Sequence, residues 1–267
     1  MSENLVILLE WFRANGISDF FNINPVNAFD TKKEIINKDI KPVTFEKTVD
    51  LLAKKQEEIK KILPNDYIQD IKNTCDSIQS IDDICSYVKQ YDGYNNIRKL
   101  ANNTIIYDGS QKSDVLIIND FPNEIDDEEG TVFSGEAKEM MNNMLKAISL
   151  NSDDCCFLNS FFWRLAGNRI PIKEEFNLCK PVVEKFIKLV DPKIIIFMGN
   201  YSLNNLTTIN SSLVKVRGQF FEYSNSYIFN KIESVATFGP NFLKNNVAKK
   251  REVWQDLINI KKFLDNN

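Results

Sequence analysis

The chain has 267 residues, of which 43% are hydrophobic and 26% charged, a composition typical of a globular protein with a sizeable core. Its net charge of −4 provides no global basic field, so any nucleic-acid partner must be held by a local patch. The sequence contains no histidine, which excludes Ser-His and Cys-His nucleophile pairs, histidine general bases and histidine zinc sites. Any chemistry must therefore use carboxylates, amides, backbone donors, lysine or arginine.

Cysteine usage and the first residues both bear on the location of the protein. The five cysteines are odd in number and form no Cys-x-x-Cys pair, so we expect no disulfide framework and predict a reducing cytoplasm. Adjacent Cys155 and Cys156 are interpreted as small core residues. Residues 5–12 are apolar but interrupted by Glu10 and too short to span a bilayer, so neither a signal peptide nor a membrane segment is predicted.

The N-terminal third is predicted to be a helical extension that covers residues 1–99. A first helix is predicted from residue 5 to near Gly16, and a proline-containing linker follows over 22–44. Further helical patterns occur at 45–63, 67–75 and 81–91. Because no cluster of site-like residues occurs here, a packing role is favoured over a catalytic one.

Strands and helices alternate from residue 100 onward. Buried-looking apolar runs at 115–118, 155–158, 193–198 and 234–238 alternate with helical patterns at 136–149, 173–190, 200–208 and 246–264. A further strand and turn are predicted at 104–109. This alternation implies a parallel sheet with right-handed crossovers. The predicted fold class is therefore α/β: residues 100–267 form a three-layer α/β/α domain around a central, mostly parallel four-stranded sheet.

A polar loop follows each predicted strand, and these loops meet at one edge of the sheet. Asp120 is the first carboxylate past the first strand, Asn159 ends the second, and Gly239 follows the fourth. In open parallel sheets the loops at the carboxyl ends of the strands build the site. An acidic loop is expected between the first strand and Phe133. We therefore predict the functional site at this common edge.

Two stretches combine residue types that suit nucleic-acid contact. In the loop at 160–171, Phe161, Phe162 and Trp163 stand beside two arginines, which suits either base stacking with phosphate contact or aromatic packing beneath a loop. The C-terminal stretch at 244–262 is rich in lysine, which fits either DNA contact or a solvated helix face. Arg217-Gly218 in a predicted turn is a further, weak candidate for phosphate contact.

From about residue 91 to the end, the order and spacing of several motifs resemble the uracil-DNA glycosylases of the iron–sulfur, family-four branch. Residues 119–123 (Asn-Asp-Phe-Pro-Asn) stand where that family has Gly-Glu-Ala/Gly-Pro-Gly. The resemblance continues through Asp126-Asp127, Gly130, Phe133-Ser134-Gly135, Asn159, Arg164, Gly167-Asn168-Arg169-Ile170-Pro171, Cys179-Lys180-Pro181, Val216-Arg217-Gly218 and residues 250–257. It extends over roughly 165 residues.

The resemblance implies a hydrolase of base-excision repair that flips uracil out of DNA and cleaves its bond to deoxyribose. The implied partner is uracil-containing DNA, single- or double-stranded. No association with a membrane is expected. Phe133 would stack on the base beside Phe121, and Asn159 would read its edge. Asp126 would crowd the C5 position, and Asp120 would position water and offset positive charge on the sugar. The implied DNA-binding residues are Arg169, Arg217, Asn241, Lys244, Lys249 and Arg251.

The chain also departs from the family pattern. Gly239-Pro240 stands where the family has His-Pro, so the histidine that donates to uracil O2 is missing, and Gly239 or a water would have to replace it. Asp92, Asn95 and Trp163 replace three of the four cluster cysteines and leave Cys179, so neither an iron–sulfur cluster nor another metal is expected. These departures leave room for the alternative of a catalytically inactive, glycosylase-fold DNA-binding or interaction protein. A nucleotide-binding enzyme is disfavoured because no glycine-rich phosphate motif follows any strand.

Overall fold

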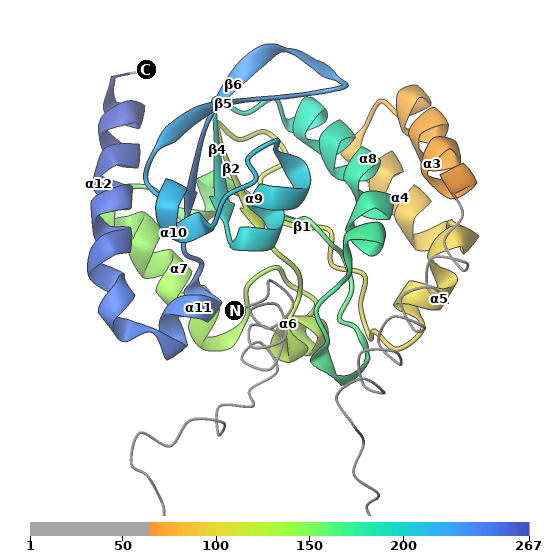
Figure 1. The fold of residues 1–267 in the computed structure, drawn as a ribbon, viewed down its shortest axis with the longest axis horizontal. Coiled ribbons are helices and arrows are strands. Elements are labelled where there is room, and N and C mark those ends of the chain that lie inside the picture. Colours follow the sequence, from red (N-terminus) through yellow and green to blue (C-terminus); the bar gives the residue numbers. More distant parts are fainter. Residues whose placement is uncertain (1–64, 267) are drawn as a thin grey trace, which may run out of the picture. The chain divides into compact units, whose positions relative to one another are not determined.

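A six-stranded sheet forms the centre of the computed structural model, which describes residues 65–266 (Figure 1). The strand order is β1-β3-β2-β4-β6-β5, in which the four inner strands β3, β2, β4 and β6 are parallel neighbours. The short strands β1 and β5 pair antiparallel at the two edges. The strands are β1 (Tyr107–Gly109), β2 (Val115–Asn119), β3 (Cys155–Asn159), β4 (Ile194–Met198), β5 (Phe220–Asn225) and β6 (Ile228–Thr237). The predicted parallel strands are confirmed, and two edge strands make the sheet larger than the four strands predicted.

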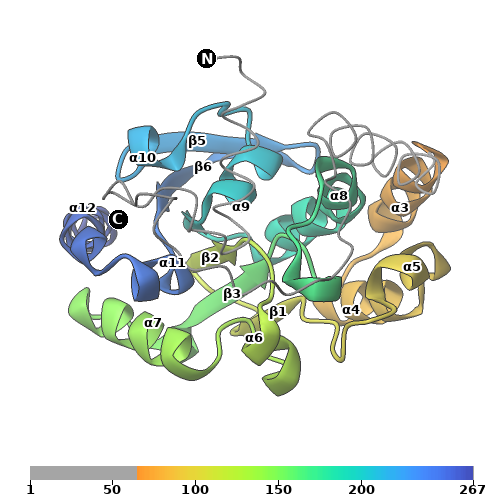
Figure 2. The ribbon, with the colours of Figure 1, turned by 60° about the horizontal axis from the view of Figure 1, so that its bottom comes forward.

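Helices cover both faces of the sheet, which explains why the inner strands are continuous apolar runs. All five residues of β2, β3 and β4 are buried. Helix α7 packs with α11 and α12 on one face, and α8 packs with α9 on the other (Figure 2). The helices are α3 (Asn65–Ser77), α4 (Ile81–Gln90), α5 (Asn95–Arg98), α6 (Glu124–Glu129), α7 (Gly135–Ala147), α8 (Lys173–Val190), α9 (Asn200–Leu206), α10 (Leu213–Val216), α11 (Pro240–Asn245) and α12 (Lys250–Asp265).

The sheet register brings the ends of the inner strands to one level. Asn119 at the end of β2 lies opposite Asn159 of β3 and Met198 of β4, and Met198 lies opposite Thr237 of β6. The segment after each strand therefore begins at the same edge. The predicted convergence of these junctions follows from this register.

The predicted acidic loop after β2 is wrong, because residues 124–129 form the short helix α6. Asn123 caps this helix: its side chain accepts from the Asp126 N–H at 3.0 Å, and the Asp126 carboxylate accepts from the Asn123 N–H at 3.0 Å. Gly130 ends the helix in the left-handed conformation, at φ 74°. Acidic residues in a first turn are favourable beside the helix dipole. Six residues are too few for a helical period to be recognised in the sequence.

The three aromatic side chains of the 160–171 loop belong to the core. Phe161 and Phe162 are 0% exposed and Trp163 is 1% exposed, so base stacking by these rings is excluded and the packing interpretation holds. Arg164 forms an ion pair with Asp127 at 3.0 Å. The loop therefore contributes apolar mass to the interior and leaves its arginines toward the surface.

The first described helices, α3 and α4, pack against α8. The helices predicted at 67–75 and 81–91 correspond to them, whereas those predicted at 5–16 and 45–63 lie outside the described residues. Among the described helices, none combines the length and the apolar character that crossing a bilayer requires.

Removal of the Asp127 carboxylate should destabilise the fold. This buried side chain accepts the N–H groups of Asn102 and Asn103 at 2.9–3.1 Å and pairs with Arg164. The Asp127→Ala variant leaves three donors without their acceptor, so we expect the free energy of unfolding in urea to fall by about 3 kcal/mol. The matched control is Glu128→Ala on the same helix, which is exposed and should change stability by less than about 0.5 kcal/mol. Equal effects of the two substitutions would contradict this assignment.

Candidate active site

A cleft of about 530 Å³ opens at the carboxyl ends of β2, β4 and β6. Asn119, Asp120 and Phe121 line it from the end of β2, and Gly199 lines it from the start of α9. Gly239 and Phe242 complete this part of the wall from the β6–α11 junction. The cleft therefore stands at the sheet edge where the sequence predicted the site.

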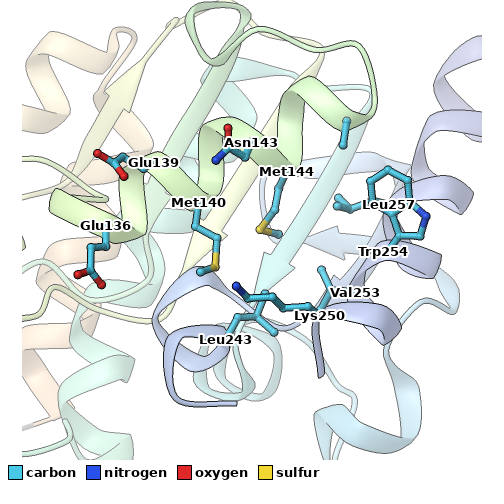
Figure 3. Close-up of a pocket in the computed structure, with 11 residues that line it drawn as sticks. Glu136, Glu139, Met140, Asn143, Met144, Leu243, Lys250, Val253, Trp254 and Leu257 are labelled. Atoms are coloured by element: carbon cyan, nitrogen blue, oxygen red, sulfur yellow. The ribbon is translucent and has the colours of Figure 1, made fainter. Parts of the chain in front are cut away.

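A second hollow, of about 420 Å³, lies between α7 and α12 (Figure 3). Met140 and Met144 reach into it from α7, facing Val253 and Leu257 of α12, so this part of its wall is apolar. Its carboxylates lie on α7, and one of them, Glu136, is paired with Lys244 at 2.9 Å. Because the strand-end cleft gathers an ionisable carboxylate and several amides, it is the better candidate for chemistry.

The Asp120 carboxylate is fixed on the first turn of α9. One oxygen accepts the Ser202 N–H at 2.7 Å, and the N–H groups of Asn200 and Tyr201 also point toward it. Gly199 has φ 144°, and a Cβ there would come within 2.2 Å of the carboxylate, so only glycine allows this contact. Burial raises the pKa of Asp120 to about 6, against the opposing effect of the N–H bonds. At neutral pH the group is therefore mainly a carboxylate held in one orientation.

Two amides form a pair below the floor of the cleft. Asn159 is 0% exposed: its oxygen accepts from the Asn119 amide at 2.9 Å, and its Nδ2 donates to the carbonyl of Ile105 at 3.0 Å. Asn119 lines the cleft and also donates to the carbonyl of Phe121 at 3.2 Å. Asn119 thus stands between the cleft and Asn159. Asn159 still has one amide hydrogen and one lone pair beyond these two bonds.

The two phenylalanines predicted to contact the base lie in different places. Phe121 lines the cleft, with its ring 5.6 Å from that of Tyr201 and 6.3 Å from that of Phe176. Phe133 is 4% exposed and borders a separate hollow of about 120 Å³, edge-on to Phe157 at 5.9 Å. The structure therefore brings Asp120, Phe121 and Gly239 together and does not bring Phe133 to the same cleft.

Asp126 is enclosed within the α6 cap. It is 0% exposed, and burial raises the pKa of its carboxyl to about 6, against hydrogen bonds from Asn123 and Ser134. Asn123, which it orients, lines the cleft and donates to Asn241 across the mouth at 3.3 Å. Asp126 is therefore linked to the cleft through Asn123.

Gly239 lies in ordinary extended backbone, at φ −79° and ψ 165°, directly before the first residue of α11. A Cβ at this position would lie 3.2 Å from the Met198 carbonyl oxygen and 3.5 Å from the Met198 Cβ. The position therefore needs no positive φ, and a side chain requires a shift of only a few tenths of an ångström. Glycine is not dictated by the backbone here.

The predicted DNA-binding cations fall into two groups. Arg169 and Lys244 line the cleft, and each has a carboxylate partner, Glu175 at 2.6 Å and Glu136 at 2.9 Å respectively. The others do not line it: Arg217 pairs with Asp256 and Glu252, Lys249 pairs with Glu252, and Arg251 is exposed on α12. Arg164, which pairs with Asp127, also lines the cleft and is its third basic side chain.

Arg217 belongs to a buried network that fixes the end of β6. Its guanidinium donates to Asp256 at 3.1 Å, and the other oxygen of Asp256 accepts from the Thr237 hydroxyl at 2.7 Å. Asp256 is 2% exposed and lies against Gly218, where a Cβ would come 2.2 Å from its oxygen. Thr237 is the last residue of β6, two residues before Gly239. The network therefore anchors the strand that carries this wall of the cleft.

The side chains at the four cluster positions do not fit an iron–sulfur cluster. Asn95 donates to Asp92 at 2.9 Å, and Trp163 is buried and donates from its ring nitrogen to the Thr104 hydroxyl at 2.9 Å. Cys179 is fully buried, and burial raises the pKa of its thiol well above the usual value, so it stays protonated. A cluster needs about four thiolates, and this set provides one thiol. Within residues 65–266 no group of three or more Cys, Asp or Glu is arranged to hold a metal ion.

Sequence reasoning missed two contributors to the cleft. The motif comparison treats Asn119 only as a replacement for a glycine, although its place at the end of a strand, like that of Asn159, is a signal for an amide pair. The contact of the Asp120 carboxylate with the first turn of α9 was also missed. Gly199, between an apolar strand and a helix, is a signal that another group approaches the backbone closely there. Neither signal identifies the partner, since that depends on the order of the strands.

Comparison with known proteins gives a consistent result. Residues 106–258 match the family model described as the uracil DNA glycosylase superfamily. A type-4 uracil-DNA glycosylase from Saccharolobus solfataricus is 29% identical over 171 residues, which cover 62% of this chain and 78% of that protein. One from Sulfurisphaera tokodaii is 30% identical over 124 residues, covering 45% of this chain and only 56% of that protein. A DNA polymerase of Bacillus phage SP01 is 26% identical over 122 residues, covering 45% of this chain and 13% of that protein.

The buried Asp126 carboxyl should make stability depend on pH. Its pKa is raised to about 6, so the folded protein holds the proton more tightly than the unfolded chain, and this contribution to stability is lost as pH rises from about 4 through about 6. The Asp126→Asn variant keeps an acceptor for the Asn123 N–H and does not titrate. We therefore expect its free energy of unfolding to rise relative to wild type by roughly 3 kcal/mol between pH 4 and pH 7.

Urea unfolding across this pH range measures the effect. The exposed Glu128→Gln, on the same helix, is the control and should show a constant difference from wild type. A constant difference for Asp126→Asn as well would contradict the raised pKa.

Proposed function

The chain belongs to the uracil-DNA glycosylase superfamily, and on that premise we propose that it binds uracil-containing DNA and hydrolyses the uracil–deoxyribose bond at the strand-end cleft. The observation that carries the proposal is the Asp120 carboxylate, fixed on α9 and facing a cleft that also contains Asn119, Phe121 and Gly239. The match to type-4 enzymes supports the same reaction class. Flipping of the base out of the helix is part of this proposal, since the reacting bond cannot otherwise reach the cleft.

Asp120 would act on the sugar. As the bond between uracil N1 and the sugar C1′ breaks, its electron pair leaves with uracil and C1′ becomes cationic. A carboxylate that is already oriented by the Ser202 N–H stabilises that charge without reorganising. Water then adds to C1′, and its proton is released to Asp120 or to solvent. The carboxylate must be ionised for this role.

Base recognition would use the ring and the amides that line the cleft. Phe121 offers a ring at the cleft wall, so we assign it the stacking contact, with Phe133 packed behind the α6–α7 junction rather than against the base. The Asn119–Asn159 pair would read the N3–H and O4 edge, with Asn119 in contact and Asn159 reached when the Asn119 side chain moves aside. Asp126 would act through Asn123 at the mouth of the cleft.

DNA would be held by cations around the mouth. Arg169 and Lys244 line it and would contact phosphates together with Asn241, and Lys249 at the end of the turn Val247–Lys249 and Arg251 in the first turn of α12 would add further contacts. Arg217 is occupied by Asp256 and Glu252, so we assign it to holding β6. A local patch of this kind is sufficient for DNA contact despite the net negative charge.

A second candidate function is DNA or partner binding without catalysis. The observation that favours it is the combination of an enclosed Asn159 with Gly239 at the wall where the family has its histidine. Loss of one donor to a developing oxyanion reduces rate on the order of 10²–10³-fold. The two candidates therefore differ in turnover and not in the place where DNA binds.

Uracil release decides between them. We expect the protein, in excess over a single-stranded oligonucleotide with one uracil, to generate abasic sites that alkali cleaves. Asn159→Ala should abolish the product, and Asp120→Asn should reduce the rate roughly 10²-fold. Product at the level of a buffer control, with retained affinity for the oligonucleotide, would establish the binding function and overturn catalysis.

The rate should depend on the protonation of Asp120. Its pKa is raised to about 6, so the carboxylate is lost as pH falls, and we expect the single-turnover rate to decline about tenfold per pH unit below about 6. Asp120→Asn should remove this acid limb. The chain has no histidine that could produce such a limb. A wild-type profile that is flat down to pH 5 would contradict the assignment.

A histidine placed at residue 239 should strengthen catalysis. The negative φ of Gly239 suits a side chain, and the nearest contact of a new Cβ, the Met198 carbonyl at 3.2 Å, requires a shift of only a few tenths of an ångström. We expect Gly239→His to raise the rate of uracil release on the order of 10²-fold, because it supplies a donor for uracil O2. Gly239→Ala introduces the same Cβ without the donor and is the matched control. An equal rate for the two variants would show that O2 is not presented to this wall.

A further inference from the structure

A run of touching aromatic rings connects the N-terminal helices with the cleft. The ring of Tyr94 lies 4.9 Å from that of Trp163, and Trp163 lies 5.7 Å from Phe161. Phe161 is 5.6 Å from Phe176, which is in turn 6.3 Å from Phe121 at the cleft wall. These separations lie within the range of favourable ring pairs. We refer to Tyr94, Trp163, Phe161, Phe176 and Phe121 as the aromatic spine.

Phe176 supports both walls of the site at the cleft end of the spine. Besides Phe121, it stacks on Tyr201 at 5.9 Å with an interplanar angle of 7°. Tyr201 lies in the first turn of α9, whose N–H groups hold Asp120. A shift of Phe176 would therefore move the proposed base-stacking ring and the seat of the catalytic carboxylate together.

Hydrogen bonds fix the other end of the spine. The Tyr94 hydroxyl donates to the carbonyl of Leu178 in α8 at 3.0 Å, and Trp163 donates to Thr104 ahead of β1 at 2.9 Å. Both rings are almost completely buried, at 0% and 1% exposed. Buried Tyr and Trp side chains with satisfied polar groups adopt one orientation. The rings therefore tie three segments that are far apart in the sequence.

The spine passes through the place where the cluster ligands would stand. The four positions lie in the segments 92–95, 163 and 179, and the spine joins the same three segments. Tyr94 lies between Asp92 and Asn95, and Trp163 is itself one of the four positions. Leu178, whose carbonyl accepts from Tyr94, precedes Cys179. The side chains present do not form a thiolate set. Packing of rings therefore connects the segments that metal–thiolate bonds would connect.

We propose that the aromatic spine braces the fold in place of a metal cluster and that Trp163 is a positioning residue for the cleft. The brace rests on close packing, since interiors at crystal-like density transmit displacement from one side chain to the next. The role of Trp163 in catalysis rests on the proposed function of the cleft. The structural role of the spine does not depend on that function. Two readouts without catalysis test it.

Amide hydrogen exchange of the full chain measures how far the brace reaches. We expect Trp163→Leu to lower the melting temperature on the order of 10 °C and to speed exchange in peptides that cover 119–123 and 199–203, at the cleft. Peptides of the central strand β4 should keep their protection. Trp254→Leu is the matched control, because Trp254 is half exposed on α12 and outside the spine, and it should leave the cleft peptides unchanged.

Milder variants keep the test decisive if Trp163→Leu does not fold. Trp163→Phe retains a ring and loses the bond to Thr104, and Tyr94→Phe loses only the hydroxyl that donates to Leu178. Both should fold, with smaller changes in the same cleft peptides. Destabilisation with cleft exchange equal to wild type would overturn the positioning role, whether or not the protein releases uracil.

Iron analysis tests the replacement itself. We expect the chain, produced in iron-supplemented cells and purified without oxygen, to contain no stoichiometric iron and to show the same melting temperature after treatment with a strong chelator. Bound iron with visible thiolate-to-iron absorbance, or a melting temperature lowered by the chelator, would overturn the proposal. Cys179→Ser should leave the metal content unchanged.

Discussion

The contact between the Asp120 carboxylate and the first turn of α9 determines the geometry of the cleft. It joins the end of β2 to the end of β4, two strands that are adjacent only because the chain crosses over the sheet between them. The N–H groups at a helix start are donors without intrahelical partners, and a carboxylate satisfies them. Gly199 provides the space for this approach. The Asn119–Asn159 pair makes an equivalent connection between β2 and β3.

These connections explain how one buried carboxyl can be held in one orientation and still be mainly ionised at neutral pH. Burial favours the protonated form of Asp120, whereas the N–H bonds favour the ionised form, and the balance leaves its pKa at about 6. Without the N–H bonds, burial would leave more of the Asp120 carboxyl protonated at neutral pH. The neighbouring acid Asp126 has a similarly raised pKa but points into its own helix cap, where it is structural.

The sequence predicted the inner sheet and the edge that carries the cleft, because unbroken apolar runs such as Val115–Ile118 can only be buried on both faces. A strand and turn were expected at 104–109, where β1 forms over Tyr107–Gly109, whereas β5 was not predicted, because its mixed burial pattern is typical of an edge. The sequence also does not predict which side chains contact one another. Asp120 meets Ser202 across 82 residues, and Asn119 meets Asn159 across 40, and these distances along the chain close only through strand order and register.

The aromatic residues also show what the sequence cannot reveal, which is whether a side chain faces solvent or the core. Phe161, Phe162 and Trp163 beside arginines have the composition of a nucleic-acid loop, but composition does not reveal which side of a loop faces solvent. These rings belong to the core, where Trp163 contacts Tyr94 and Phe161 contacts Phe176 of α8. Phe121 and Phe133 are predicted for one pocket, but they line separate hollows, and helix α6 lies between them in the sequence.

The paired state of the cations at the cleft has a consequence for how DNA would bind under the proposed function. Arg169 and Lys244 each hold a carboxylate already, so a phosphate gains only the difference between itself and Glu175 or Glu136. Under the proposed function, an undamaged duplex would therefore gain little from these cations, and its contacts with this acidic protein would be brief. The lifetime of the complex would then depend on the base that enters the cleft. This favours rapid scanning of many sites over tight binding to any one of them.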